Sequence, residues 1–139
     1  MSLHRASGGP VHVLDVGGNV GFMALFAASI GPLVHVTTVE PHPWHRRLLQ
    51  PSIAINGLND RVRVEGTLLG PKAAAPPACI FVSDPRNAGS TEVKLDAEVK
   101  ECRALGGEMV GMTTIDAILD ASPFGRRVDV LKIDVEARH

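Results

Sequence analysis

The stretch VHVLDVGGNVG, from Val11 to Gly21, indicates how the chain folds. Its first half, Val11–Val16, is a run of mostly apolar, β-branched residues bounded by glycine-containing turns, which is typical of a buried β-strand. Asp15 lies at the end of this strand, and the following glycine-rich turn contains Asn19, which is expected to cap the next helix. A strand that leads through such a turn into a helix is characteristic of parallel α/β proteins, which bind ligands at the carboxyl ends of their strands.

The alternation of strand and helix continues beyond this unit. The expected strands cover residues 11–16, 33–40, 61–66 and 128–135, and the expected helices cover residues 22–30, 44–56 and 113–122. The first helix has one face that carries Phe22, Leu25, Phe26, Ser29 and Ile30. Pro51 inside the second helix predicts a kink or a late helix start. The pattern predicts a Rossmann-like α/β fold, with a doubly wound, mostly parallel sheet and helices on both faces.

The middle of the chain, residues 71–107, is less regular and resembles a long inserted loop. CIFVS and TEVKL are two candidate strands around the turn DPRNAGS, although the second segment could instead begin a helix that runs through Cys102. No internal repeat or domain boundary is visible, so residues 1–139 are expected to form a single domain.

Composition restricts the partners of the chain. A formal net charge of −1 over 139 residues, with 4% aromatic residues and no Tyr, argues against nucleic acid or an anionic membrane as a partner. Cys79 and Cys102 are far apart and form no CxxC pair, so they are interpreted as unpaired, buried cysteines in a reducing compartment. Without a signal-peptide pattern or a long apolar run, the expected localisation is cytoplasmic.

The glycine turn does not fit a dinucleotide site. When the last glycine of a G-x-G-x-x-G pattern is placed on Gly21, the first falls on Val16. A carboxylate at Asp15 would also repel a phosphate at the same turn. We therefore expect a ligand with a positive group near Asp15 and a negative group at the helix start. With Glu40 at the end of the second strand available to ribose hydroxyls, an amino acid joined to a nucleoside fits, which describes S-adenosylmethionine.

Several segments also resemble one family in the order in which that family has them. LDVGGNVG is similar to the D-x-G-x-N-x-G motif of class I S-adenosylmethionine-dependent methyltransferases, and in particular of the FkbM family. The further segments are VEPHP, SIAINGL, TTIDAIL and LKIDVE, with RNAGST as a weaker match, so the resemblance covers residues 11–136.

The resemblance implies the roles of individual residues. Cofactor contacts are expected at Asp15, Gly17, Gly18, Asn19, Gly21 and Glu40. Asp134 and Glu136 would lie near the transferred methyl group, as candidate catalytic residues. Such enzymes methylate oxygen atoms of sugars or other small metabolites. We expect no metal, because His42 and His45 lack a third nearby ligand.

Two alternatives to this function remain. One is a non-catalytic nucleoside-binding or interaction module with a methyltransferase-like half-fold. The other, a nicotinamide-dependent oxidoreductase, is disfavoured by the glycine spacing described above.

The last predicted strand suggests that the fold is incomplete at its C-terminal end. Residues 128–135 form a near-continuous apolar run, as in strands covered on both faces, and the resemblance implies an interior strand beside the first one. The chain ends four residues after Val135, too soon for a crossover helix to a further parallel strand. We therefore expect a truncated methyltransferase that is inactive alone and self-associates through an exposed strand edge.

Overall fold

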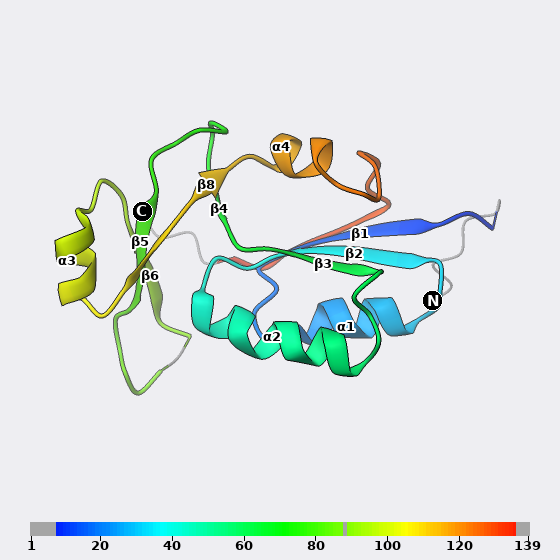
Figure 1. The fold of residues 1–139 in the computed structure, drawn as a ribbon, viewed down its shortest axis with the longest axis horizontal. Coiled ribbons are helices and arrows are strands. Elements are labelled where there is room, and N and C mark those ends of the chain that lie inside the picture. The colour runs from blue at the N-terminus through cyan, green and yellow to red at the C-terminus, as the bar shows by residue number, and fades with distance from the viewer. Residues whose placement is uncertain (1–7, 88, 136–139) are drawn as a thin grey trace.

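The computed structural model of the chain describes residues 8–87 and 89–135, which form an α/β fold (Figure 1). Its strands are β1 (Val11–Val16), β2 (Val34–Val39), β3 (Val62–Glu65), β4 (Leu68–Leu69), β5 (Ala78–Val82), β6 (Thr91–Lys94), β7 (Glu108–Val110), β8 (Met112–Thr113) and β9 (Val130–Ile133). Its helices are α1 (Phe22–Ser29), α2 (Pro43–Ile55), α3 (Val99–Ala104) and α4 (Ile115–Asp120).

The centre of the fold is a four-stranded sheet in the order β3-β2-β1-β9, in which every neighbouring pair is parallel. Helices α1 and α2 cover one face of this sheet, and α4 covers the other (Figure 1). The predicted doubly wound, mostly parallel α/β fold is therefore confirmed. The register of β1 against β9 places Asp15 opposite Lys132, a pairing that matters for the site described below.

The two faces of the sheet bury separate apolar clusters. Under α1 and α2, alternate valines of the strands, such as Val13 and Val36, pack against Leu49 and Ile53 of α2. Under α4, Leu14 and Val16 pack with Ile118. This alternation is what a strand covered on both faces requires, because successive side chains point to opposite faces.

Helix α1 differs from its prediction in two ways. It buries Ala24, Ala27 and Ala28, while Phe22 and Phe26 on the predicted apolar face are 76% and 57% exposed. Small residues let the helix approach the sheet closely, so volume rather than hydrophobicity decides which face is buried. Its N-cap is Gly21 rather than Asn19, and no described side chain caps it.

The other predicted helices are found close to their expected positions. Helix α2 begins at Pro43 and continues through Pro51 to Ile55, which excludes the late start. Thr114 caps α4 by accepting a hydrogen bond from the backbone N–H of Ala117 at 3.1 Å.

The middle region, residues 71–107, is only partly a loop. It forms a second, antiparallel sheet in the order β6-β5-β7, with α3 beside it, beyond one end of the parallel sheet (Figure 1). The predicted hairpin of CIFVS and TEVKL is confirmed as β5 and β6. The alternative, a helix that begins at TEVKL, is wrong, because α3 starts only at Val99.

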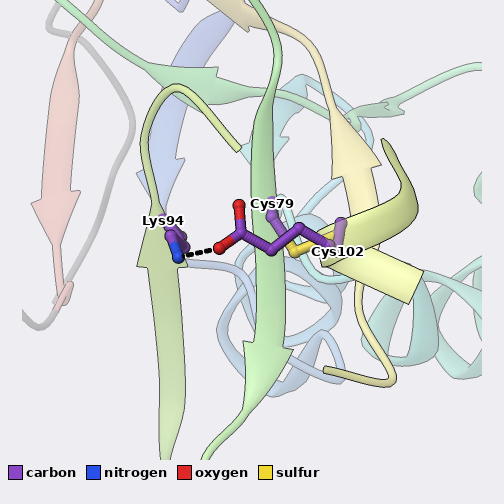
Figure 2. Close-up of a disulfide and its surroundings, with 4 residues drawn as sticks. Cys79, Lys94 and Cys102 are labelled. Carbon is purple, nitrogen blue, oxygen red and sulfur yellow. Dashed lines mark hydrogen bonds and ion pairs between the residues drawn. A yellow bond between two sulfur atoms is a disulfide. The ribbon is translucent and has the colours of Figure 1, made fainter. Parts of the chain in front are cut away.

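The two cysteines are bonded to each other, which corrects their interpretation as unpaired residues. Cys79 on β5 and Cys102 on α3 form a disulfide across a sequence separation of 23 residues (Figure 2). Together with Ala97 they make the buried core of the small sheet. The argument for a reducing compartment from unpaired cysteines is therefore wrong, and a cytoplasmic location stays a prediction.

Strand β9 lies at one edge of the parallel sheet. It covers Val130–Ile133, shorter than the predicted 128–135, and among the described strands it pairs only with β1. Leu131 and Ile133 are 54% and 57% exposed. The predicted place beside the first strand is confirmed.

Within residues 8–87 and 89–135, no helix is long and apolar enough to cross a membrane.

Candidate cofactor site

A cavity of about 660 Å³ lies at the carboxyl end of the parallel sheet. It is lined by the turn after β1, with Gly17, Gly18 and Asn19, and by β5 and β6, with Ile80 and Thr91. Apolar side chains that line it are Val20, Phe22, Met23, Leu68, Leu69 and Val93. The volume suits a small-molecule ligand, for which sites of about 300–1,000 Å³ are usual.

The glycines of the turn are needed for contacts within the protein itself. Gly17 has a φ of +87°, and a Cβ there would lie 2.1 Å from the backbone oxygen of Asp134. At Gly18 a Cβ would lie 1.9 Å from Thr38 Oγ1. At Gly21, φ is +97° and a Cβ would meet Leu49 at 2.2 Å. Gly17 and Gly18 line the cavity with their backbone atoms, whereas Gly21 does not line the cavity.

The turn leaves the start of α1 open to a ligand. Asn19 lies in the left-handed region, with a φ of 51°, and Gly21 provides no side chain to cap the helix. The first backbone N–H groups of a helix have no partner within the helix and carry partial positive charge. Phe22 and Met23, the first helical residues, line the cavity. An anionic group is therefore favoured at this end of it.

Glu40 follows β2 and lines the cavity. The side chain is held by the backbone: Oε2 accepts a hydrogen bond from the N–H of Asn19 at 2.6 Å, and Oε1 accepts one from the N–H of His42 at 2.8 Å. Burial alone would raise the pKa of Glu40, but hydrogen bonds from His45, His42 and Asn19 outweigh it and hold the pKa below its ordinary value. Glu40 is thus a fixed, ionised acceptor at the cavity wall.

Asp15 lies near the end of β1, and the cofactor contact expected of it stays a prediction. Its side chain is almost fully buried and does not line the cavity. Oδ2 accepts a hydrogen bond from Thr38 Oγ1 at 3.0 Å, and Oδ1 lies 3.0 Å from the Nζ atom of Lys132. Oδ1 has this ion pair but no aligned hydrogen bond among the described residues.

Lys132 is a site residue that sequence reasoning missed. It lines the cavity, and its ammonium also donates to the backbone oxygen of Gly17 at 2.9 Å. The signal available in the sequence was a lysine inside an otherwise apolar strand, LKIDV, two residues before Asp134. Only the register of β9 against β1 shows that it pairs with Asp15 rather than with Asp134.

Of the two predicted catalytic residues, the structure describes only Asp134. Asp134 lines the cavity, and its backbone N–H donates to the Val16 oxygen at 2.9 Å, so the residue is tied to the end of β1 while its side chain is exposed. Glu136 lies outside the described residues.

Two histidines lie beside Glu40. The Nδ1 atom of His45 is 3.4 Å from Glu40 Oε1, and the rings of His42 and His45 are 4.6 Å apart. Burial and the neighbouring His45 ring lower the pKa of His42. His42 is the N-cap of α2, because its Nδ1 accepts a hydrogen bond from the backbone N–H of Trp44 at 3.2 Å. In the described part of the chain, no group of three or more His, Cys, Asp or Glu could hold a metal ion.

The class of protein follows from comparison with known families. Residues 15–137 match the methyltransferase FkbM domain. Because the match covers most of the chain, the chain belongs to the FkbM methyltransferase domain family, as the sequence motifs predicted.

Individual relatives match over shorter segments. The O-methyltransferase imqG of Aspergillus flavus is 33% identical over 64 residues, which is 46% of this chain and 26% of that protein. The apo structure of the S-adenosylmethionine-dependent methyltransferase SibL has 28% identity and a TM-score of 0.41, with 48% of this chain and 19% of that one covered. The [4+2]-cyclase SpnF has 23% identity and a TM-score of 0.41, with 49% and 25% covered. The chain thus spans about a quarter of the length of its curated relative.

Proposed function

We propose that this chain binds S-adenosylmethionine in the cavity at the carboxyl end of the parallel sheet and supports methylation of an oxygen atom of a small acceptor. The observation that carries the proposal is the geometry of Glu40. Its carboxylate is fixed at the cavity wall by two backbone N–H groups, and it is kept ionised there without a neighbouring lysine or arginine in contact among the described residues.

The remaining hydrogen-bond capacity of Glu40 suits a ribose. A carboxylate offers about four lone-pair positions, and the backbone N–H groups of Asn19 and His42 use one position on each oxygen. Oε2 therefore has a position left for a ribose hydroxyl, whereas Oε1 also faces His45 Nδ1 at 3.4 Å. The apolar side chains of the cavity, such as Leu68 and Leu69, suit a purine. The uncapped start of α1 suits a carboxylate.

These positions indicate what the cofactor and the protein would each contribute to methyl transfer. When bound, S-adenosylmethionine supplies a methyl group that its sulfonium has already activated, so the protein has to position the acceptor and exclude water. Ile80 and Thr91 of the small sheet also line the cavity, so both sheets are available to contact the ligand and its acceptor. The exposed carboxylate of Asp134 would accept a hydrogen bond or a proton from the acceptor hydroxyl. Glu136 is proposed as a second catalytic residue.

The class of acceptor is part of the proposal. Membership of the FkbM domain family and the match to a fungal protein named as an O-methyltransferase support an oxygen atom of a small metabolite or a sugar. The near-neutral charge of the chain argues against a nucleic acid as acceptor.

The test is a calorimetric titration with S-adenosylhomocysteine, adenosine and NAD. We expect S-adenosylhomocysteine to bind and NAD not to bind. Glu40→Gln should weaken S-adenosylhomocysteine about tenfold or more, since a charge-assisted hydrogen bond contributes about 1.5–3 kcal/mol. The matched control is Glu65→Gln, the same change at the end of β3, outside the cavity lining. Equal affinity of Glu40→Gln and wild type would refute the ribose contact.

A nucleoside-binding module without catalysis is separated by a second measurement. Labelled methyl from S-adenosylmethionine should be transferred to an acceptor in a metabolite screen if the chain is an enzyme as it stands. Binding of S-adenosylhomocysteine without transfer to any acceptor would agree both with the non-catalytic alternative and with the expected inactivity of this chain alone, whereas any transfer would exclude both.

A further inference from the structure

The ion pair between Lys132 and Asp15 changes what the site demands of its ligand. Asp15 was expected to organise either the ammonium of an amino acid or nearby backbone donors. In the structure its carboxylate is 2% exposed, it does not line the cavity, and an ammonium from the protein already lies 3.0 Å away. A second cation at this position would meet Lys132 as a like charge.

Lys132 instead presents positive charge to the cavity. Its side chain is 26% exposed and lines the cavity wall, and in the described part of the chain it is the only lysine or arginine that does so. An ammonium has three N–H donors. One is directed to the Gly17 oxygen and a second faces Asp15, so at least one remains for a ligand.

The surroundings of Lys132 fix the position of this charge. Thr38 Oγ1 donates a hydrogen bond to Asp15 and so fixes the carboxylate. The same hydroxyl packs against Gly18, where a Cβ would collide with it. Burial of Asp15 means that water screens its pair with Lys132 little. The ammonium therefore stays beside the glycine turn, next to the uncapped start of α1.

We propose that Lys132 binds the carboxylate of the amino-acid part of the ligand, and that Asp15 is a positioning residue that acts through Lys132. This inference rests on the proposed function, because it assigns one end of the same S-adenosylmethionine site. It predicts selectivity for nucleosides that carry a carboxylate in this position over those that lack one.

The experiment compares S-adenosylhomocysteine with 5′-methylthioadenosine, which keeps the adenosine and the sulfur but lacks the amino-acid part. Wild type should bind S-adenosylhomocysteine more tightly. In Lys132→Met the affinity for S-adenosylhomocysteine should fall about tenfold or more, while the affinity for 5′-methylthioadenosine changes less than about threefold. Lys100→Met, the same change on the exposed part of α3, should alter neither affinity.

A second variant distinguishes the loss of a ligand contact from destabilisation of the fold. Lys132→Met leaves the buried carboxylate of Asp15 without its ion pair, which destabilises a fold. The double variant Asp15→Asn, Lys132→Met removes both charges and should bind the two ligands as the single variant does, because Asp15 acts only through Lys132.

The outcomes separate the two proposals. Parallel loss of both ligands or unchanged affinities in Lys132→Met would overturn the role of Lys132 while the cofactor site stands. A further loss of S-adenosylhomocysteine in the double variant would overturn the positioning role of Asp15. A wild type that binds neither ligand would overturn the proposed function, and this inference with it.

Discussion

The parallel sheet and the small antiparallel sheet are stabilised in different ways. The four parallel strands bury apolar residues on both faces, under α1 and α2 on one side and α4 on the other. The small sheet has a core of Cys79, Ala97 and Cys102, with partly buried Phe81 and Met109 against it. One region is stabilised by extensive apolar burial, and the other depends on a covalent bond. The candidate cofactor cavity lies between the two and uses side chains from both.

The largest expected effect follows from removing that covalent bond. In the double variant Cys79→Ala, Cys102→Ala, the small sheet should lose about 3 kcal/mol of stability, because the disulfide closes a loop with a sequence separation of 23 residues. Hydrogen exchange measured by mass spectrometry should become about 100-fold faster over residues 78–110. Protection in β1 and β2 should be unchanged.

Wild type treated with dithiothreitol is the control and should match the double variant. Equal loss of protection in both sheets would show that they unfold as one unit and would contradict the view that they are stabilised in different ways.

The second prediction concerns close packing under the glycine turn. Gly18→Ala would place a Cβ 1.9 Å from Thr38 Oγ1, which is buried and hydrogen-bonded to Asp15. We therefore expect the free energy of unfolding, measured by urea denaturation, to fall by about 1–3 kcal/mol. The matched change in the region of the small sheet is Gly111→Ala. No heavy atom of the described residues lies within 4 Å of a Cβ there, and the expected change is below about 0.5 kcal/mol. Similar losses in the two variants would contradict the packing argument.

The parallel sheet was predictable because its rules are local. The apolar runs that became β1, β2 and β9, and the acids at their ends, can be identified by periodicity in one sequence. The burial of the alanine face of α1 was not predictable, because it depends on how closely the helix approaches the sheet. The small sheet was only partly predictable: its hairpin has a turn signal, but β7 and the pairing of the cysteines depend on contacts between distant residues.

The same distinction applies to the site. The place of Glu40 at the cavity could be predicted, because a strand end fixes which edge of the sheet an acid reaches. Asp15 was placed at the correct strand end, yet its side chain points below the turn to Thr38 and Lys132. Which neighbours a strand has, and therefore which charge compensates a carboxylate, is information that sequence periodicity does not contain.

The third prediction is a dependence of stability on pH that comes from Glu40. Although its burial opposes ionisation, hydrogen bonds lower its pKa below the ordinary value of 4.5. A carboxyl group with a lowered pKa in the folded state adds stability above its unfolded pKa, and this stability is lost as the pH falls through the folded pKa. The melting temperature of wild type should therefore exceed that of Glu40→Gln near neutral pH, with the difference shrinking below about pH 4.5. A difference that stays constant down to pH 3 would contradict this assignment.

The smallest effect concerns the exposed edges of the two sheets, and it tests the predicted self-association. An open edge offers unpaired backbone groups to a second chain, and charged side chains discourage such pairing. The edge strand β6 carries Glu92 and Lys94, whereas β9 exposes Leu131 and Ile133, and its one lysine is turned to Asp15. We therefore expect wild type to self-associate weakly through β9, as a rise of average mass with concentration in analytical ultracentrifugation. Ile133→Lys should abolish this rise, while Leu95→Lys, at a 61% exposed position just after β6, should leave it unchanged. Self-association that persists in Ile133→Lys would show that another surface is responsible, and a wild type that stays monomeric at all concentrations would show that the open edge of β9 alone does not drive pairing.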